Sequence, residues 1–212
     1  AYYAWRSARV WQIFRQEWGS SRESRLRHVL AGLANDEAVL RAWKAVLERR
    51  SPAGIALTRQ NVPVLARGAD AASGDTLAAA HHVAKGAYVL AEAANGSPDV
   101  ILIATGSEVA VALDARAQLA ERGVHARVVS APCLEWFEEQ SAEYREQVLP
   151  SAVTARVSVE AGLALSWHRY VGDRGRTVSI EHFGASADYQ TLFREFGITA
   201  EAVTAAALES IA

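Results

Sequence analysis

The sequence predicts an α/β fold, a three-layer sandwich with a mostly parallel sheet. Residues 100–104 (VILIA) are continuously apolar, which is typical of a strand buried on both faces of a parallel sheet. Apolar runs of this kind alternate with helical patterns to the end of the chain, as they do in βαβ units with right-handed crossovers. With 212 residues, half of them hydrophobic, the chain can bury one large core.

A tight turn at 105–108 (TGSE) follows this strand and opens a helix. The spacing of apolar residues predicts an inner helix face made of Val109, Ala112, Leu113, Ala117 and Ala120. The elements that follow are predicted as strands over 126–129, 156–159 and 177–180, short helices over 134–149, and helices over 188–196 and 200–211. Before the first strand, a hairpin-like turn is expected around Asn95-Gly96.

A separate helix is predicted upstream, between Asn35, which can cap its first turn, and Arg50. Its apolar residues fall on one face: Val39, Ala42, Trp43, Val46 and Leu47. Ser51-Pro52 ends the helix, and residues 54–58 (GIALT) then predict a short buried strand. One helix and one strand leave this apolar face without a native partner, so the face and Trp43 are expected to be exposed or misdocked.

Composition and charge exclude several classes of protein. The net charge is −2 and the pI about 6.3, so no global field attracts nucleic acid or an anionic membrane. The single cysteine, Cys133, excludes an internal disulfide and fits a reducing, cytoplasmic location. No apolar run is long enough for a membrane helix, and the N-terminus does not have the pattern of a signal peptide.

Seven segments carry a resemblance to a known family. They are ALTRQNVP (56–63), GAYVL (86–90), ILIATGSEV (101–109), RVVSAPCLEWFEEQ (127–140), YREQVLP (144–150), TARVSVEAG (154–162) and HFGASADYQTLFREFGIT (182–199). Together they resemble the C-terminal part of transketolase, in the family's order, over about 34–212. Transketolases are thiamine-diphosphate enzymes that transfer a two-carbon ketol unit from a ketose phosphate to an aldose phosphate.

The resemblance implies a division of the chain into domains. Residues 34–63 correspond to the tail of the pyrimidine-binding domain, 64–85 to a linker, and 86–212 to the C-terminal domain. Residues 1–33 do not resemble the family and are left unassigned, as a non-native or disordered segment. This segment is rich in Trp and Arg, so binding of single-stranded nucleic acid is a weaker alternative, and no nucleic-acid or membrane partner is expected.

One binding residue of the family can be carried over, Arg59 in the TRQN run, which matches the arginine that holds the substrate phosphate. A guanidinium can meet a phosphate with two parallel hydrogen bonds, whereas the alternative is a structural salt bridge. The metal-binding motif and the catalytic groups of the family lie upstream of this sequence. Thiamine diphosphate and Mg²⁺ therefore belong to the parent enzyme, and neither catalytic nor cofactor-binding residues are expected in this chain.

Other candidate residues have structural explanations that are at least as good. Gly106-Ser107 could cradle an anion at a helix N-terminus, or Ser107 or Thr105 could simply cap the helix. Glu160 could face a cleft or a subunit contact, or be a structural carboxylate. His81-His82 could bind a metal with other ligands, or be a solvated pair. His168, Glu181 and His182 could form an acid/base set, but no nucleophile accompanies them. Cys133 is expected to be an inert buried thiol.

Two functions from different classes remain. In the first, the chain is the C-terminal portion of a transketolase and is an enzyme only by family resemblance, because the fragment alone is expected to be inactive. In the second, it is an interaction or dimerisation module without catalysis. The resemblance implies sugar phosphates as ligands of the parent enzyme and a homodimeric assembly in the family.

Overall fold

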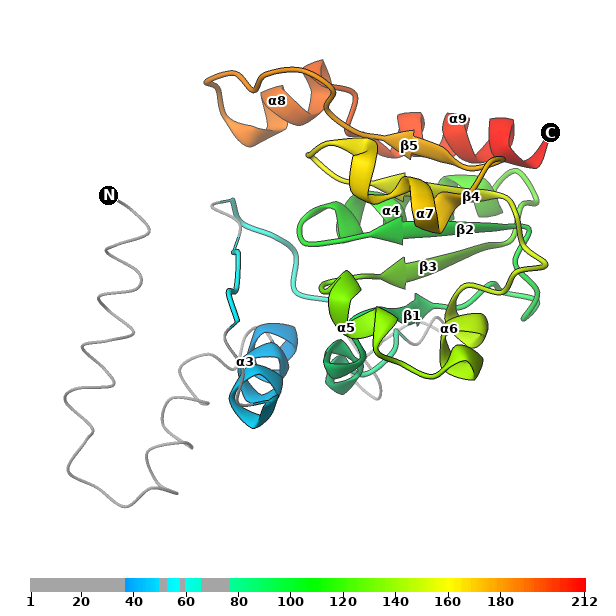
Figure 1. Ribbon diagram of the computed structural model, residues 1–212. Coiled ribbons are helices and arrows are strands. Elements are labelled where there is room, and N and C mark those ends of the chain that lie inside the picture. Colours follow the sequence, from blue (N-terminus) through cyan, green and yellow to red (C-terminus); the bar gives the residue numbers. More distant parts are fainter. Residues whose placement is uncertain (1–36, 50–52, 58–59, 66–76) are drawn as a thin grey trace. The chain divides into compact units, whose positions relative to one another are not determined.

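The computed structural model describes residues 37–49, 53–57, 60–65 and 77–212 (Figure 1). The chain comprises two compact units, Ala1–Ser51 and Pro52–Ala212, and each is described here by itself. In the parts described, no helix is both long enough and apolar enough to cross a membrane.

Helix α3 (Glu37–Arg49) is the described element of the first unit. It forms where the sequence predicts it, and a Lys44–Glu48 ion pair at 3.7 Å supports its exposed side. The expected exposure of Trp43 is confirmed, since 44% of its surface is accessible, and Leu47 is 68% exposed. Ala45, which is not part of the predicted face, is only 6% exposed, so a buried face made of the predicted residues is not confirmed.

The strand predicted over 54–58 is wrong in its described part. Residues 53–57 have no regular structure, and Leu57 is 46% exposed. A strand is held by hydrogen bonds to a neighbouring strand, and nothing in the described chain pairs with this segment. The segment is apolar, as buried strands are, but an apolar composition does not supply a neighbouring strand for hydrogen bonding.

The second unit contains a five-stranded sheet in the order β1-β3-β2-β4-β5. Its strands are β1 (Tyr88–Ala91), β2 (Val100–Ala104), β3 (Ala126–Ser130), β4 (Arg156–Val159) and β5 (Arg176–Val178). Strands β2 to β5 run in one direction, whereas β1 pairs antiparallel with β3 at the edge (Figure 1). The predicted mostly parallel sheet is thus confirmed.

The turn at Asn95-Gly96 exists but does not make a hairpin. The backbone N–H of Ser97 donates to Asn95 Oδ1 at 2.9 Å, which closes the turn. Strand β1 nevertheless pairs with β3 and not with β2, the strand that follows the turn. The sequence therefore predicted the turn correctly, but the hairpin that such a turn suggests does not form, because β1 and β2 are not paired.

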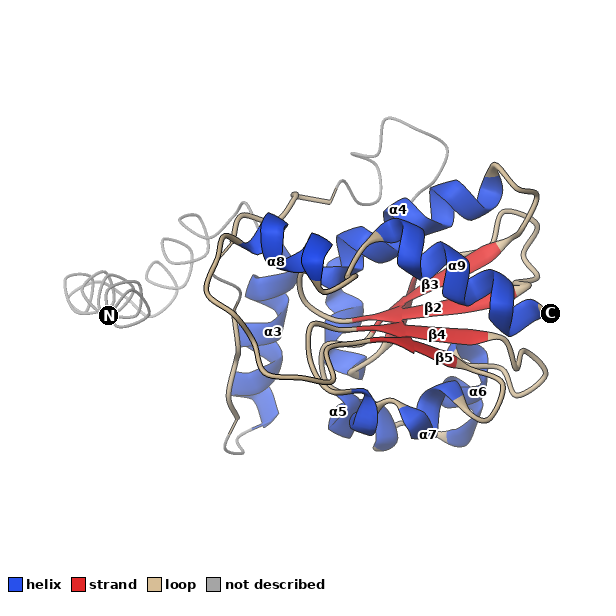
Figure 2. Ribbon diagram, turned by 90° about the horizontal axis from the view of Figure 1, so that it is seen from above, coloured by secondary structure: helices blue, strands red, loops and turns tan. Residues whose placement is uncertain are grey.

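Helices cover both faces of the sheet and make the three predicted layers (Figure 2). Helices α4 (Glu108–Ala120) and α9 (Ala200–Ile211) cover one face. Helices α5 (Leu134–Glu138), α6 (Ala142–Val148) and α7 (His168–Val171) cover the other. The shorter elements are η2 (Ala80–Lys85), η3 (Ala164–Ser166) and α8 (Tyr189–Glu195).

Strand β2 lies at the centre of the core and is at most 1% exposed along its whole length. Alternate side chains of a strand point to opposite faces. Ile101 and Ile103 pack with Phe137 of α5 and with Trp167 and Tyr170 beside and within α7. The intervening side chains point toward α4 and α9, so both layers depend on this strand.

The inner face of α4 was only partly predicted. Val109 and Ala112 are buried as expected, but Ala117 and Ala120 are exposed. Ala115 and Leu119 are buried instead, each with 0% of its surface accessible. An alanine-rich helix has a weak contrast between its faces, so the sheet and α9 decide which side is buried.

Gly86 occupies a position that only glycine fits. Its φ of 83° lies in the left-handed region, and a Cβ there would lie 2.3 Å from the Phe137 nitrogen and 2.4 Å from the Cys133 oxygen. Both are backbone atoms at the start of α5, and the Cys133 N–H also donates to the Gly86 carbonyl at 2.9 Å. The close approach lets η2 and β1 pack against α5.

We predict that Gly86→Ala lowers the free energy of unfolding by about 3 kcal/mol or more, since backbone strain and overpacking add. Gly96→Ala is the matched control, because Gly96 also has a positive φ, 74°, but open space around the added Cβ. Its cost should be about 1 kcal/mol, from the backbone conformation alone. Urea unfolding of the two variants measures the difference, and equal losses would contradict the packing argument.

Candidate functional site

Three glutamate side chains follow the carboxyl ends of parallel strands. Glu108 follows β2, Glu160 directly follows β4, and Glu181 lies shortly after β5. The carboxyl ends of parallel strands meet at one edge of a sheet, where open α/β folds bind ligands. This edge is therefore the first place to test for a functional site.

Glu108 occupies the helix N-terminus at which an anion was considered. Glu108 is only 6% exposed, and its Oε2 accepts a hydrogen bond from Ser107 Oγ at 2.9 Å. Its Oε1 accepts from the Ala161 N–H at 3.0 Å. Of the two predicted caps, Ser107 or Thr105, Ser107 is the N-cap residue of α4, but its hydroxyl bonds to the Glu108 carboxylate and makes no capping hydrogen bond. A negative charge built into the first helical turn leaves little attraction for an external anion.

Glu160 is held by a buried tryptophan. The Trp167 indole Nε1–H donates to Glu160 Oε2 at 2.5 Å, and Trp167 is 2% exposed. A buried indole N–H needs an acceptor, and the carboxylate provides one. This contact supports the structural reading of Glu160, which sequence reasoning had left open against a cleft or a subunit contact.

Glu181 fixes the backbone that follows β4. It accepts hydrogen bonds from the Ala164 N–H and from Ser179 Oγ, both at 2.8 Å. The bond from the Ala164 N–H, followed by that from Ser179, lowers the pKa of Glu181, because both favour the charged carboxylate. Together, Glu108, Glu160 and Glu181 anchor the segment 160–167 at three points.

The acid/base set considered for His168, Glu181 and His182 does not come together as one site. His182 Nδ1 lies 2.8 Å from the Phe183 carbonyl oxygen, and its ring packs edge-on against Phe196 at 4.8 Å between ring centroids. His168 belongs to α7 and lines a different hollow. Glu181 is engaged by Ala164 and Ser179, so no proton relay joins the three.

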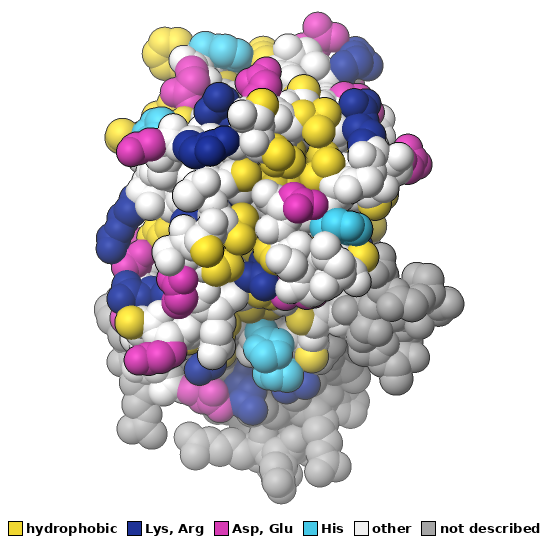
Figure 3. Space-filling view, turned by 90° about the vertical axis from the view of Figure 1, so that its right-hand side faces the viewer, with side chains coloured by type: hydrophobic (Ala, Val, Ile, Leu, Met, Phe, Trp, Pro, Cys, Tyr) yellow, Lys and Arg dark blue, Asp and Glu magenta, His cyan; other side chains and the backbone are white. Residues whose placement is uncertain are grey.

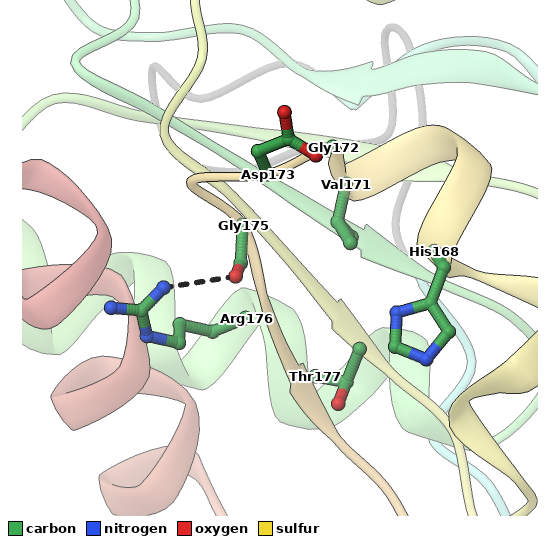
Figure 4. Close-up of a pocket in the computed structure, with 7 residues that line it drawn as sticks. All are labelled: His168, Val171, Gly172, Asp173, Gly175, Arg176 and Thr177. Atoms are coloured by element: carbon green, nitrogen blue, oxygen red, sulfur yellow. Dashed lines mark hydrogen bonds between the residues drawn. The ribbon is translucent and has the colours of Figure 1, made fainter.

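The hollow beside His168 has a volume of about 410 Å³ (Figure 4). It is lined largely by the connection from α7 to β5, with Asp173 and Arg176 as its other ionisable side chains. Arg176 donates to the carbonyl oxygens of Arg174 and Gly175 at 3.0 Å and pairs with Glu209 at 3.5 Å. Its guanidinium therefore holds the loop in place rather than standing ready for a ligand.

His81 and His82 lie in the 3-10 helix η2 and not in a flexible segment. Their ring centroids are 4.1 Å apart, and His82 stacks on Tyr88 at 5.9 Å. Burial, followed by the neighbouring His81 and Lys85, lowers the pKa of His82. No group of three potential metal ligands is found in the described residues, so the pair has no further ligands there.

The thiol of Cys133 fits the inert role expected of it. Its Sγ donates to Glu135 Oε2 at 3.4 Å. Burial is the largest influence on this group and raises the pKa of the Cys133 thiol, which disfavours the reactive thiolate.

Arg59, the substrate-binding residue implied by the resemblance, lies outside the described residues. The described segments on either side, 53–57 and 60–65, are mostly exposed and lack regular structure. Its role in binding a phosphate therefore stays a prediction.

The anchored segment 160–167 carries two exposed leucines. Leu163 is 59% exposed and Leu165 is 79% exposed, and Phe183, two residues after Glu181, is 97% exposed. We call Leu163 and Leu165 the apolar edge patch. Sequence reasoning missed it, because an apolar residue in a loop does not reveal whether its side chain is buried. On another face of the molecule, basic, acidic and hydrophobic side chains are interspersed (Figure 3).

The fold and the carboxylate-anchored edge define a class of protein, an α/β domain with a mixed five-stranded sheet. Residues 86–199 match the family model described as "Transketolase-like TK C-terminal domain". The chain belongs to the transketolase family.

Relatives and solved structures agree with this assignment. Transketolase from Mycobacterium tuberculosis is 55% identical over 190 residues, which are 86% of this chain and 25% of that protein. The chloroplastic transketolase of Solanum tuberosum is 50% identical over 164 residues, covering 77% and 21%. A transketolase mutant from Pichia stipitis, solved with fructose 6-phosphate, superimposes with a TM-score of 0.70 at 34% identity, covering 82% and 24%. The chain thus spans about a quarter of the length of its relatives.

We predict that Glu181 contributes stability that depends on pH. Its pKa in the folded chain is lowered, so its contribution is present above the unfolded-state pKa, about 4.3, and is lost as pH falls through the folded value. Glu181→Gln should therefore be less stable than the parent at pH 7, and the two should converge near pH 3. Thermal unfolding at several pH values measures this.

The control for Glu181→Gln is Glu121→Gln, an exposed position just after α4. This substitution should change the stability at pH 7 by no more than about 0.5 kcal/mol. A gap between Glu181→Gln and the parent that stays constant from pH 7 to pH 3 would refute the assignment.

Proposed function

We propose that this chain is the C-terminal portion of a transketolase whose parent transfers a two-carbon ketol unit from a ketose phosphate to an aldose phosphate, and that the chain alone is inactive. The observation that carries the proposal is the coverage. The matched region is 86% of this chain and only 25% of the Mycobacterium tuberculosis relative. Three quarters of that relative's length therefore has no counterpart in the match.

The described residues do not fit thiamine diphosphate and Mg²⁺. Magnesium bound to a diphosphate is usually held by one or two protein carboxylates together with the phosphate oxygens. Glu108, Glu160 and Glu181 each already accept a hydrogen bond from the domain's own groups. We therefore assign no catalytic step to this chain and place cofactor binding in the parent enzyme.

The proposal includes the division of the chain by family resemblance. Residues 34–63 would be the tail of the pyrimidine-binding domain, 64–85 a linker and 86–212 the C-terminal domain, with 1–33 unassigned. Within the parent, Arg59 would bind the substrate phosphate, and the enzyme would work as a cytoplasmic homodimer.

We predict that the purified chain shows no saturable binding of thiamine diphosphate with Mg²⁺ in titration calorimetry and no ketol transfer between sugar phosphates. The physical reason is that the cofactor site is assigned to the three quarters of the parent enzyme that have no counterpart in the match. A full-length transketolase under the same conditions is the positive control. A micromolar cofactor site, or transfer activity free of contaminating enzyme, would overturn the proposal.

The second candidate function is an interaction or dimerisation module. The apolar edge patch favours it, because Leu163 and Leu165 sit on a backbone that is already anchored by three carboxylates. An apolar surface held rigidly in water loses little conformational entropy when a partner covers it.

Light scattering coupled to size exclusion distinguishes the two functions. A stable symmetric dimer that Leu165→Asp converts to monomer would favour the module, since the new charge would be buried in the interface. Val64→Asp, at a position that is 75% exposed outside the patch, is the matched control and should not change the mass. A monomer at all concentrations supports an isolated portion of the enzyme.

A further inference from the structure

A second hollow lies on the opposite side of the domain from the carboxylate edge. Its volume is about 320 Å³, and it opens between α5, α6 and α7. It gathers three arginines from three separate elements: Arg145 of α6, Arg156 at the start of β4, and Arg169 of α7. Because Arg156 begins its strand, the hollow belongs to the amino end of the sheet.

One carboxylate oxygen brings two of the guanidinium groups together. Glu138 Oε2 accepts from Arg145 Nη1 at 2.9 Å and from Arg169 Nη2 at 2.9 Å. Both groups therefore lie within one hydrogen bond of the same point, although the residues are 24 positions apart in the chain. The side chains stay accessible, at 37% for Arg145 and 71% for Arg169.

Most donors of these two guanidinium groups are unused. A guanidinium carries several N–H donors in a planar fork. Among the residues that the structure describes, the guanidinium groups of Arg145 and Arg169 make no hydrogen bond other than those to Glu138. Each side chain is thus oriented by Glu138 and still presents free N–H groups at the hollow.

Arg156 plays a different part, because it is engaged by the backbone. It donates to the carbonyl oxygens of Val153, Tyr170, Leu149 and Pro150 at 2.8 to 3.2 Å. These bonds hold its positive charge in the wall of the hollow without any neutralising carboxylate in hydrogen-bond contact.

The carboxylates of the hollow do not cancel this charge. The lining holds three arginines against Glu138 and Glu146. Glu146 accepts from both the N–H and the hydroxyl of Ser151 at 2.8 Å, and these bonds lower the pKa of Glu146. Burial, followed by a hydrogen bond to Glu138, raises the pKa of Tyr170 to about 12, so its hydroxyl remains a neutral donor.

We propose that this hollow binds the phosphate group of a small organic phosphate, with Arg145 and Arg169 as the residues that contact it. Glu138 occupies the point where the two groups converge and holds them close together, and the N–H groups that it leaves free offer several donors to the oxygens of a phosphate. The volume suits a small metabolite, and Phe137 and Leu149 provide an apolar wall for its carbon skeleton. This site is independent of the proposed transketolase function.

The competing explanation is that the two arginines only tie α5, α6 and α7 together through Glu138. That explanation predicts lower stability when either arginine is removed and no binding of phosphate. Binding and stability must therefore be measured separately on the same variants.

The test is a titration of the full chain, labelled with ¹⁵N, with inorganic phosphate and then glycerol phosphate at constant ionic strength. Sodium chloride replaces the omitted phosphate, so that general screening is the same at every point. We expect the Nε–Hε resonances of Arg145 and Arg169 to shift and saturate. Arg169→Gln and Arg145→Gln should each weaken the binding by about tenfold or more, because each removes a charge-assisted hydrogen bond.

The matched control is Arg194→Gln on α8, an arginine that is 68% exposed and also paired with one glutamate, Glu195, at 3.1 Å. Its affinity for phosphate should equal that of the parent. Arg169→Lys keeps the charge without the fork and should bind more weakly than the parent if the fork matters. Thermal unfolding of every variant shows whether a loss of binding reflects a loss of folding.

Three outcomes would overturn the proposal. The first is an absence of saturable shifts at phosphate concentrations of tens of millimolar in the folded parent. The second is an equal loss of binding in Arg194→Gln. The third is acetate that binds as tightly as phosphate, which would refute the assignment to a phosphate group.

Discussion

The burial of β2 on both faces is the constraint on which the rest of the domain depends. Its five residues are at most 1% exposed, and it pairs in parallel with β3 on one side and with β4 on the other. A strand that is apolar all round must have a helical layer above it and another below it. Ile101 and Ile103 require α5 and α7, whereas the alternate positions require α4 and α9.

The polar groups at the carboxyl edge serve the backbone of the domain. Glu108 and Glu181 accept backbone N–H groups from the turn after β4, and Glu160 accepts the indole N–H of Trp167. Buried or half-buried donors of this kind are costly when they are left without partners. These carboxylates therefore stabilise the turn after β4 and its buried tryptophan.

The arginines fall into two groups: some use their donors to hold the backbone, and others keep donors available for a ligand. Arg156 and Arg176 donate to carbonyl oxygens at the ends of helices and loops and thereby satisfy acceptors that would otherwise lack donors. Arg145 and Arg169 are oriented by one shared carboxylate and keep other donors available. Residue type alone does not separate these roles, since the difference lies in which partners the fold brings near.

Sequence by itself determined the fold class and most element positions, because a continuously apolar run such as 100–104 and the helical spacing of apolar residues in the segments that follow are local signals. Seven segments carried the family resemblance. Tertiary structure decided that β1 pairs with β3, that Leu119 replaces Ala120 in the core, and that residues 53–57 form no strand. It also decided the anchoring by Glu108 and the meeting of Arg145 with Arg169 at Glu138. Local pattern reports which side chains share a face, whereas contacts between distant segments depend on how the layers pack.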